Sequence, residues 1–198
     1  MSGLNVGTWR GALALALALA GVAPAHGQTF EVTSGRVVVV CPLTVGGRFE
    51  VTTTAVAGQI TLDARVREIE GVLGVDLRTL DAGIGLRTSH LKETYLEVQR
   101  GPLFERATLS GIVLDTPVAG MPNGPVGFQG QFTLHGQTRA VAGNVDLSRK
   151  DGRYDVRVRF PLRIDAFQIA RPAYLGVGVS NDIDVTVRAT LVAVAPSR

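Results

Sequence analysis

The most regular feature of the chain is an alternation of apolar and polar residues along short segments. From residue 153 to residue 164, one set of alternate positions is apolar and the other is mainly charged. The apolar set is Tyr154, Val156, Val158, Phe160 and Leu162, and the charged set is Arg153, Asp155, Arg157, Arg159 and Arg163. Successive side chains of a strand point to opposite faces of a sheet. The alternation therefore predicts a strand with one buried and one solvated face.

The same period of two recurs along most of the chain. It predicts further strands at Phe30–Val40, Thr44–Val51, Val56–Asp63, Glu70–Arg78, Phe104–Leu114, 126–134, 140–147 and 182–188. Turn-forming residues separate these segments, among them His135-Gly136 and the Lys150-Asp151-Gly152 sequence. An Asp-Gly pair between two alternating runs is a strong signal for a β-hairpin. The order of strands and tight turns favours an all-β fold.

One segment departs from this pattern. Between residues 81 and 98, Leu91 and Tyr95 have helical spacing. We therefore expect a short helix near Arg87–Tyr95, with Thr88 or Ser89 as its N-terminal cap. This helix would lie against one end of the sheet and close it.

The strand faces also predict how the sheet is arranged. About eight antiparallel strands each present one apolar and one polar face, and a single flat sheet would leave the apolar face in water. Closing the sheet removes its edges and turns the apolar face inward. We therefore expect an eight-stranded, lipocalin-like β-barrel, which can be filled by side chains or can hold a small ligand. A β-sandwich with the same core residues is the alternative.

The first residues have the composition of a secretory signal peptide. Arg10 is the only charged residue before Glu31, and an Ala- and Leu-rich run from Gly11 to Val22 follows it. This run is shorter than the roughly 20 residues needed to cross a bilayer. Small residues around 25–27 then form a cleavage zone. The sequence predicts a signal peptide at 1–27, a single domain at 28–198 and a periplasmic or secreted protein; an uncleaved anchor is the alternative.

Composition and charge exclude several classes of function. The chain is 45% hydrophobic and 19% charged, which is typical of a folded globular domain. Its net charge is +3, but the basic residues are interleaved with acidic ones and form no stripe suited to nucleic acid. Cys41 is the only cysteine, so no internal disulfide can form, and we expect a buried, unreactive thiol.

Several motifs together resemble the YceI-like family of small secreted bacterial proteins. Phe132–Arg139, with the sequence FTLHGQTR, is similar to the family pattern Leu-Thr-Leu-His-Gly-Val-Thr-Arg. Other family landmarks follow in the expected order at 47–49, 58–60, 75–83, 87–91, 167–169 and 181–185. The resemblance covers nearly all of the chain after residue 28. It implies a lipocalin-like barrel that encloses a long apolar chain, such as a polyisoprenoid, a quinone or a related lipid.

This resemblance and the inward apolar faces together suggest lipid-contacting residues. Leu91 and Tyr95 of the helix, and Tyr174 of the irregular segment expected at 171–176, are candidates for the mouth of the barrel. The candidates along the strands and near their ends are Phe104, Phe128, Phe132, Leu134, Val156, Val158, Phe160, Phe167 and Ile169. Binding would come from the burial of methylene groups.

The histidines are assigned to a head-group or turn role. His135 falls at a predicted hairpin turn, where its ring could bond to the backbone or contact a lipid head group, and His90 and Arg139 are candidates for the same roles. Neither histidine has Cys, Asp or Glu residues at metal-ligand spacing. No Gly-x-Ser-x-Gly nucleophile motif is present. We therefore expect no metal, no cofactor other than a bound isoprenoid or other lipid, and no catalysis.

The expected partner is thus an apolar lipid, and nucleic acid is excluded. The charged outer face, with Arg153, Arg157, Arg159 and Arg163, is expected to be solvated, and transient contact with a membrane surface is the alternative. The oligomeric state stays open, with a homodimer among the options. The alternative function is a structural or interaction module of the cell envelope or the stress response, with a barrel filled by its own side chains.

Overall fold

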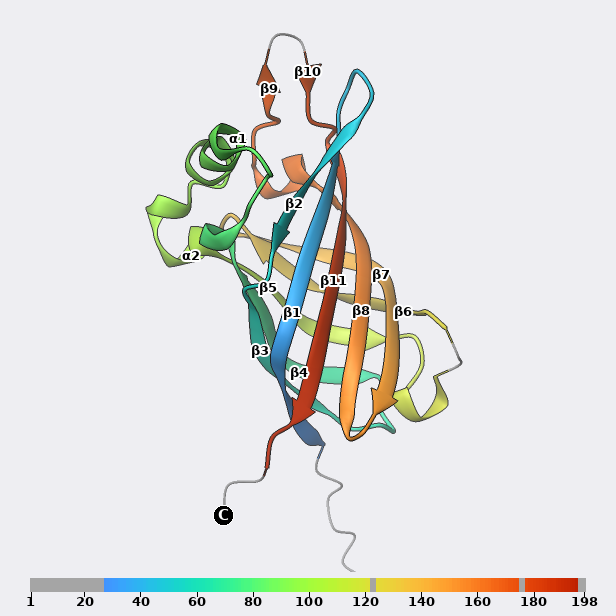
Figure 1. The fold of residues 1–198 in the computed structure, drawn as a ribbon. Helices are drawn as coiled ribbons and strands as arrows, with labels where there is room; N and C mark the ends of the chain where they lie inside the picture. Colours follow the sequence, from blue (N-terminus) through green and yellow to red (C-terminus); the bar gives the residue numbers. More distant parts are fainter. Residues whose placement is uncertain (1–26, 122–123, 175–176, 196–198) are drawn as a thin grey trace, which may run out of the picture.

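The computed structural model describes residues 27–121, 124–174 and 177–195, and its main element is a closed antiparallel β-barrel (Figure 1). The sheet has nine strands in the order β11-β8-β7-β6-β5-β4-β3-β1-β2, and β11 also pairs with β1. Its strands are β1 (Gln28–Pro42), β2 (Arg48–Thr53), β3 (Val56–Leu62), β4 (Glu68–Asp76), β5 (Arg106–Leu114), β6 (Val126–Leu134), β7 (Gln137–Lys150), β8 (Arg153–Arg163) and β11 (Asp182–Ala193). The expected eight-stranded barrel is therefore confirmed, because β2 and β3 follow one another along β1 and together form one of its eight strands.

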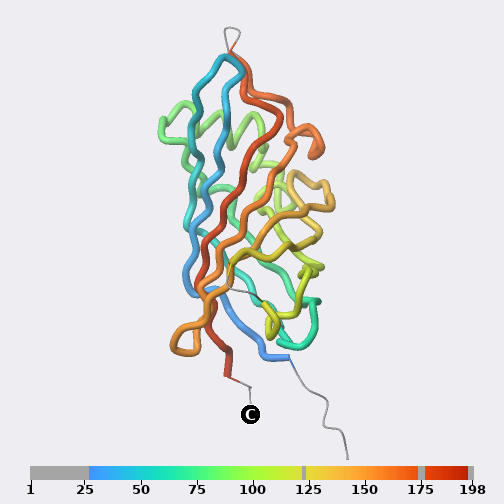
Figure 2. The backbone as a smooth tube through the Cα atoms, turned by 90° about the vertical axis from the view of Figure 1, so that its right-hand side faces the viewer, coloured from blue at the N-terminus to red at the C-terminus, as the bar shows by residue number. Residues whose placement is uncertain are grey.

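The long strand β1 closes the barrel. On one side it pairs with β11, so that the two ends of the domain run side by side (Figure 2). On the other side it pairs first with β3, through Gln28–Glu31, and then with β2, through Val37–Pro42. The strands β2 and β3 are consecutive and are interrupted only at Thr54 and Ala55. One long strand thus borders two short ones, which leaves eight strands around the barrel.

The alternation along the strands corresponds to inside and outside. On β8, Tyr154, Phe160 and Leu162 are buried, whereas Arg153 and Asp155 are exposed. Two tight turns also agree with the sequence. His135-Gly136 joins β6 to β7, Asp151-Gly152 joins β7 to β8, and all four residues have positive φ angles. This is the backbone twist that two-residue hairpins require.

A helical segment, which we call the cap (residues 77–105), covers one end of the barrel (Figure 1). It contains η1 (Leu77–Thr79), α1 (Gly85–His90), η2 (Leu91–Tyr95), η3 (Val98–Arg100) and α2 (Pro102–Glu105). We call this end the capped end. The opposite end, with the β3–β4 and β7–β8 turns, is the cavity end, where η4 (Val118–Gly120) lies between β5 and β6. Within the described residues, no helix has the length and apolar character needed to cross a membrane.

The expected helix is present, but its predicted cap is wrong. The α-helix begins at Gly85, two or more residues before either predicted capping residue, and is followed directly by the π-helical η2. The Thr88 hydroxyl instead accepts a hydrogen bond from the Ala82 N–H at 2.9 Å and donates one to Asp81. Thr88 therefore fixes the loop that leads into the helix.

Two other segments differ from the sequence prediction. Phe104 belongs to α2, because Pro102 begins a helical turn there and the following strand starts only at Arg106. The segment expected to be an irregular loop contains a small two-stranded sheet made of β9 (Ala173–Tyr174) and β10 (Val177–Gly178). After β8, η5 (Ile164–Phe167) leads toward that sheet at the capped end.

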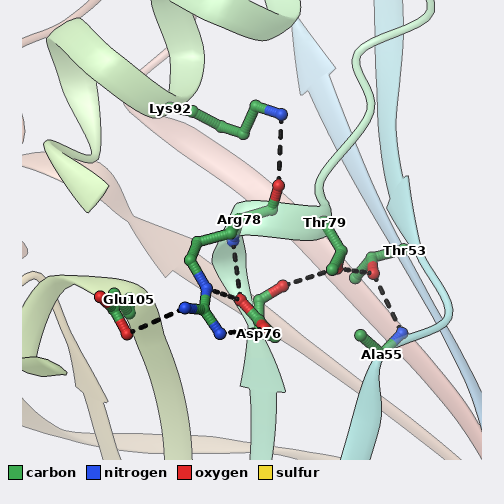
Figure 3. A network of polar contacts seen from close by, with 7 residues as sticks. All are labelled: Thr53, Ala55, Asp76, Arg78, Thr79, Lys92 and Glu105. Carbon is green, nitrogen blue, oxygen red and sulfur yellow. Dashed lines mark hydrogen bonds and ion pairs between the residues drawn. The ribbon is translucent and has the colours of Figure 1, made fainter. Parts of the chain in front are cut away.

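A polar network joins the cap to the interruption between β2 and β3 (Figure 3). The Ala55 N–H donates to the Thr53 hydroxyl, the two hydroxyls of Thr53 and Thr79 bond to each other, and Thr79 donates to the Asp76 carbonyl at 2.7 Å. Arg78 pairs with Asp76 at 2.7 Å and with Glu105 at 3.4 Å. Lys92 of η2 donates to the Arg78 carbonyl at 3.2 Å. The network satisfies the backbone where the strand breaks and fixes the start of the cap.

Candidate functional site

The barrel interior contains a cavity of about 110 Å³ toward the cavity end. Inward-facing residues of all eight strands around the barrel line it, and Val118 and Met121 cover it from the β5–β6 connection. The Ala119 N–H bonds to the Ala64 carbonyl at 2.8 Å, which holds η4 against the β3–β4 turn. The cavity is thus enclosed by strands at its sides and by η4 at the cavity end.

The buried core residues form two clusters. A large cluster extends from the capped end to the cavity, and a small cluster of Phe30, Ile60, Leu62, Tyr154 and Leu191 lies at the cavity end. Members of both clusters line the cavity. Protein interiors are normally close-packed, with few voids larger than a water molecule. The cavity is therefore a specific feature of this barrel.

One small residue, Ala189, explains part of this space, whereas Val56 fills the space beside Gly35. Gly35 of β1 lies directly opposite Ala189 of β11, and Ala189 lies opposite Val156 of β8. A Cβ atom at Gly35 would lie 2.5 Å from the Val56 Cβ, so only glycine fits there. Ala189, in contrast, lines the cavity with a side chain of one carbon. A larger side chain at position 189 would extend into the cavity.

The chemistry of the cavity wall is almost uniformly apolar. Among the described lining residues, Tyr154 alone has a polar group in its side chain, a hydroxyl. Its ring packs edge-on against Phe30, with 5.1 Å between the ring centroids. An apolar cavity of about 150 Å³ stays dry and can bind benzene. The site therefore favours hydrocarbon, and it has no convergent acids, bases or nucleophiles that could carry out a reaction.

The structure brings some of the predicted site residues together at this cavity and places others elsewhere. The predicted residues that line it are Phe128, Phe132, Val156, Val158 and Phe160. Three more, Leu134, Phe167 and Ile169, are buried in the large cluster of the capped end and do not line the cavity. Leu91 and Tyr95 are half-buried on the cap, where they pack against the same cluster. Tyr174 is in β9, and its side chain lies outside the described part of the structure.

Several lining residues were absent from the sequence prediction. They come mainly from β1, β3, β5 and β11, and include Phe30, Ile60, Leu62, Ile112 and Leu191. The same alternation that identified the lining residues of β6 and β8 is present there. Which inward residues surround the void depends on the pairing between β1 and β11, and the sequence pattern does not specify that pairing.

His135 forms a second feature, at the capped end. Its ring is 9% exposed, its Nδ1 donates to the Phe167 carbonyl at 3.1 Å, and its Nε2 lies 2.9 Å from the Glu97 carboxylate oxygen. Glu97 also accepts from Arg100 at 2.8 Å, and the Arg100 and His135 charges and hydrogen bonds hold the pKa of Glu97 below its usual range. Phe104 packs edge-on against the His135 ring. The ring thus ties the cap, the β6–β7 turn and η5 together.

The other candidate polar residues lie apart from the cavity. His90 is exposed at the end of α1, and Arg139 is exposed on β7, where it donates to the Thr138 carbonyl and to Gln137. Cys41 is buried, and burial raises the pKa of its thiol to about 11, which keeps it protonated and unreactive. No three His, Cys, Asp or Glu side chains come together as a metal site within the part of the chain that the structure describes.

A closed antiparallel barrel with an apolar internal cavity defines a lipocalin-like β-barrel as the structural class. The sequence model of the YceI-like domain matches residues 22–191. Since this match spans most of the chain, the protein belongs to the YceI-like family. The resemblance seen in the sequence motifs is therefore confirmed. None of the curated proteins matches the chain.

Solved structures share the fold at low sequence identity. A polyisoprenoid-binding domain from Saccharophagus degradans, implicated in plant cell wall breakdown, aligns with a TM-score of 0.65 and 14% identity, over 84% of this chain and 99% of that one. BcnA from Burkholderia cenocepacia aligns with a TM-score of 0.64 and 14% identity, over 79% and 95% of the two chains. The YceI protein of Campylobacter jejuni aligns with a TM-score of 0.52 and 12% identity, over 71% and 82%.

Proposed function

We propose that this protein binds the apolar chain of a lipid in the barrel cavity and carries or stores it without chemical change. The observation that supports this most directly is the apolar cavity inside the barrel, which members of both core clusters line. The description of the Saccharophagus degradans relative as polyisoprenoid-binding points to the same class of ligand. A polyisoprenoid, a quinone or a similar lipid has the required chemistry.

The size of the cavity determines how such a lipid would enter. The present volume of about 110 Å³ accepts only a short stretch of hydrocarbon. A longer chain requires the barrel to widen, and the half-buried side chains of Val118 and Met121 are the covering groups that can move aside. Each buried methylene contributes about 0.8 kcal/mol. An apolar wall distinguishes chain lengths only modestly, so we expect a broad preference for apolar chains.

The proposed place of action is the periplasm or the cell exterior. Residues 1–27 have the charge, the apolar run and the small-residue zone of a signal peptide. Residues 1–26 lie outside the described structure, and the barrel begins with β1 at Gln28. Removal of the signal peptide would therefore leave every strand of the barrel intact.

The experiment is native mass spectrometry of the full chain after incubation with a polyprenyl lipid. The test variant is Ala189→Leu, which fills the cavity, and the matched control is Ala142→Leu, the same change at an exposed position of β7. We expect the wild-type protein and Ala142→Leu to retain one lipid mass, and Ala189→Leu to lose it at least tenfold. Unfolding in urea checks that all three proteins are equally folded.

Two results would contradict the proposal. Equal retention by folded Ala189→Leu would mean that the lipid lies outside this cavity. A bare polypeptide mass for the wild-type protein at every lipid concentration would favour the interaction module, in which the barrel is only a scaffold.

A further inference from the structure

The outer face of the barrel carries a row of arginines on adjacent strands. Arg36 of β1 lies directly opposite Arg188 of β11, and Arg188 lies opposite Arg157 of β8. Arg157 in turn lies opposite Asp146 of β7. Figure 1 shows these strands side by side. Directly opposed side chains have Cβ atoms about 5 Å apart, and like charges in this position destabilise a sheet.

The arginine row is not neutralised by carboxylates in contact with it. Among the described residues, Arg36, Arg157 and Arg188 form no ion pair within 4.0 Å, whereas six other pairs do so elsewhere in the barrel and the cap. The Nε of Arg157 is buried and has no hydrogen-bond partner. Burial of this guanidinium and the nearby charges of Arg159 and Arg188 lower the pKa of Arg157, whereas the charge of Asp146 opposes this shift. Because three neighbouring guanidinium groups have no carboxylate in contact, the row is suited to a bound anion.

A second row runs parallel to the first, two residues along each strand. It consists of Ser34, Thr190, Asp155 and Ser148. The Thr190 hydroxyl donates to Asp155 at 2.9 Å, so this carboxylate already has a partner that is not an arginine. The hydroxyls of Ser34 and Ser148 form no hydrogen bond with another described residue and can bond to a ligand.

The two rows line one groove. The outer surface over β1, β11, β8 and β7 is hollowed to a volume of about 710 Å³, and both rows contribute to its lining. The side chains of these rows point away from the internal cavity, because the alternate residues Leu147, Val156 and Ala189 line that cavity from the other side of the sheet. The groove is therefore a site separate from the proposed lipid site.

We propose that this groove binds a small, soluble anion that carries phosphate groups. The guanidinium fork matches phosphate oxygens in a bidentate manner, and neighbouring hydroxyls supply further hydrogen bonds. Arginines on adjacent strands are spaced for the oxygens of one multivalent anion. The volume of the groove suits a small molecule, and Arg157 within it is half-buried, which favours a small anion over a flat membrane surface.

Inorganic pyrophosphate is the probe for this proposal. Isothermal titration at low ionic strength would compare the wild-type protein with Arg157→Gln and Arg188→Gln. The matched control is Arg48→Gln, which removes the same charge from an exposed position on β2, outside the groove. We expect pyrophosphate to bind saturably to the wild-type protein and to Arg48→Gln. We expect its affinity to fall about tenfold or more in each groove variant, since the loss of one hydrogen bond to a charged group weakens binding by about that factor. Retention of a polyprenyl lipid is expected to stay unchanged in all of them.

Three outcomes would overturn the proposal. The first is an equal loss of pyrophosphate binding in Arg48→Gln, which would indicate a diffuse charge effect. The second is an absence of pyrophosphate binding together with binding to phosphatidylglycerol vesicles that depends on Arg157 and Arg188, which would assign this face to a membrane. The third is binding to neither. A loss of lipid retention with normal pyrophosphate binding would instead contradict only the proposed function of the internal cavity.

Discussion

The apolar interior is packed differently at the two ends of the barrel. At the capped end, Phe167 is almost completely buried, packs edge-on against Phe132, and accepts a hydrogen bond from His135 through its carbonyl. At the cavity end, Ala189 presents only a methyl group and the interior keeps a void of about 110 Å³. Long strands such as β1, β8 and β11 run through both ends, so the difference comes from side-chain size and from the polar contacts of the cap.

This difference indicates how stability and binding can be divided within one sheet. Aromatic edge-to-face pairs and hydrogen bonds fix the capped end in one arrangement. The cavity wall also contains edge-to-face pairs, such as Phe30 with Tyr154. Most of its other lining residues are aliphatic and form no side-chain hydrogen bonds, so they can adapt to an entering chain. We infer that the capped end provides most of the stability and that the cavity end gives up some packing for its ligand.

The largest expected effect comes from Phe167→Ala at the capped end. Truncation of a fully buried phenylalanine should lower the free energy of unfolding by about 3–5 kcal/mol. Val187→Ala, in the cavity wall, should cost only about 1 kcal/mol, because this side chain already lacks neighbours on one side. Urea unfolding of the two variants measures the difference. Equal losses in the free energy of unfolding would contradict the inference that the capped end provides most of the stability.

A smaller effect is expected for His135→Asn. Asparagine followed by glycine is the preferred sequence for this type of turn, and it tolerates the positive φ angle of 53° at this position. If the backbone conformation of the turn were the only role of residue 135, the variant would be more stable than the wild-type protein. We expect it to be less stable by about 1–3 kcal/mol, because the buried Phe167 carbonyl loses its donor. Thermal and urea unfolding, compared with Asp151→Asn at the equivalent β7–β8 turn, distinguish the two roles.

The smallest effect concerns acid pH. The pKa of Glu97 is lowered in the folded protein by Arg100 and His135. Its contribution to stability is therefore complete above the unfolded pKa of about 4.3 and is lost as pH falls through the lowered folded value. Glu97→Gln should show a shallower loss of stability below pH 4.3 than the wild-type protein. Glu93→Gln, an exposed change on η2, serves as the control, and an identical pH profile for the two variants would contradict the role of Glu97.

Most of the fold could be predicted because the period of two is strong along almost every strand. It gave the barrel, the inward faces of β6 and β8, and the turn at His135. The beginning of the helix was missed because its N-cap residue, Ile84, has an apolar side chain that forms no capping hydrogen bond. The turn of α2 was missed because Phe104 continues the apolar pattern of the following strand.

The candidate site could be predicted only in part. Alternation identifies inward residues, but it does not distinguish Phe160, which lines the cavity, from Phe167, which is packed at the capped end. The void depends on strand pairing that brings together lining residues far apart in the sequence, such as Ala189 of β11 and Val156 of β8. The arginine row has the same origin, since Arg36, Arg157 and Arg188 meet only through strand pairing.

The central claim is that the capped end stabilises the barrel and the cavity end holds the ligand. The most direct test is to locate the apolar chain of a bound lipid. A polyprenyl lipid with a diazirine in its apolar chain would be bound to the full protein and activated by light, and the labelled peptides would be mapped by mass spectrometry. We expect labels on cavity-lining residues such as Ile112, Met121 and Leu191. Labels confined to Leu91, Tyr95 and their neighbours on the cap would contradict the account, because they would place the lipid at the capped end.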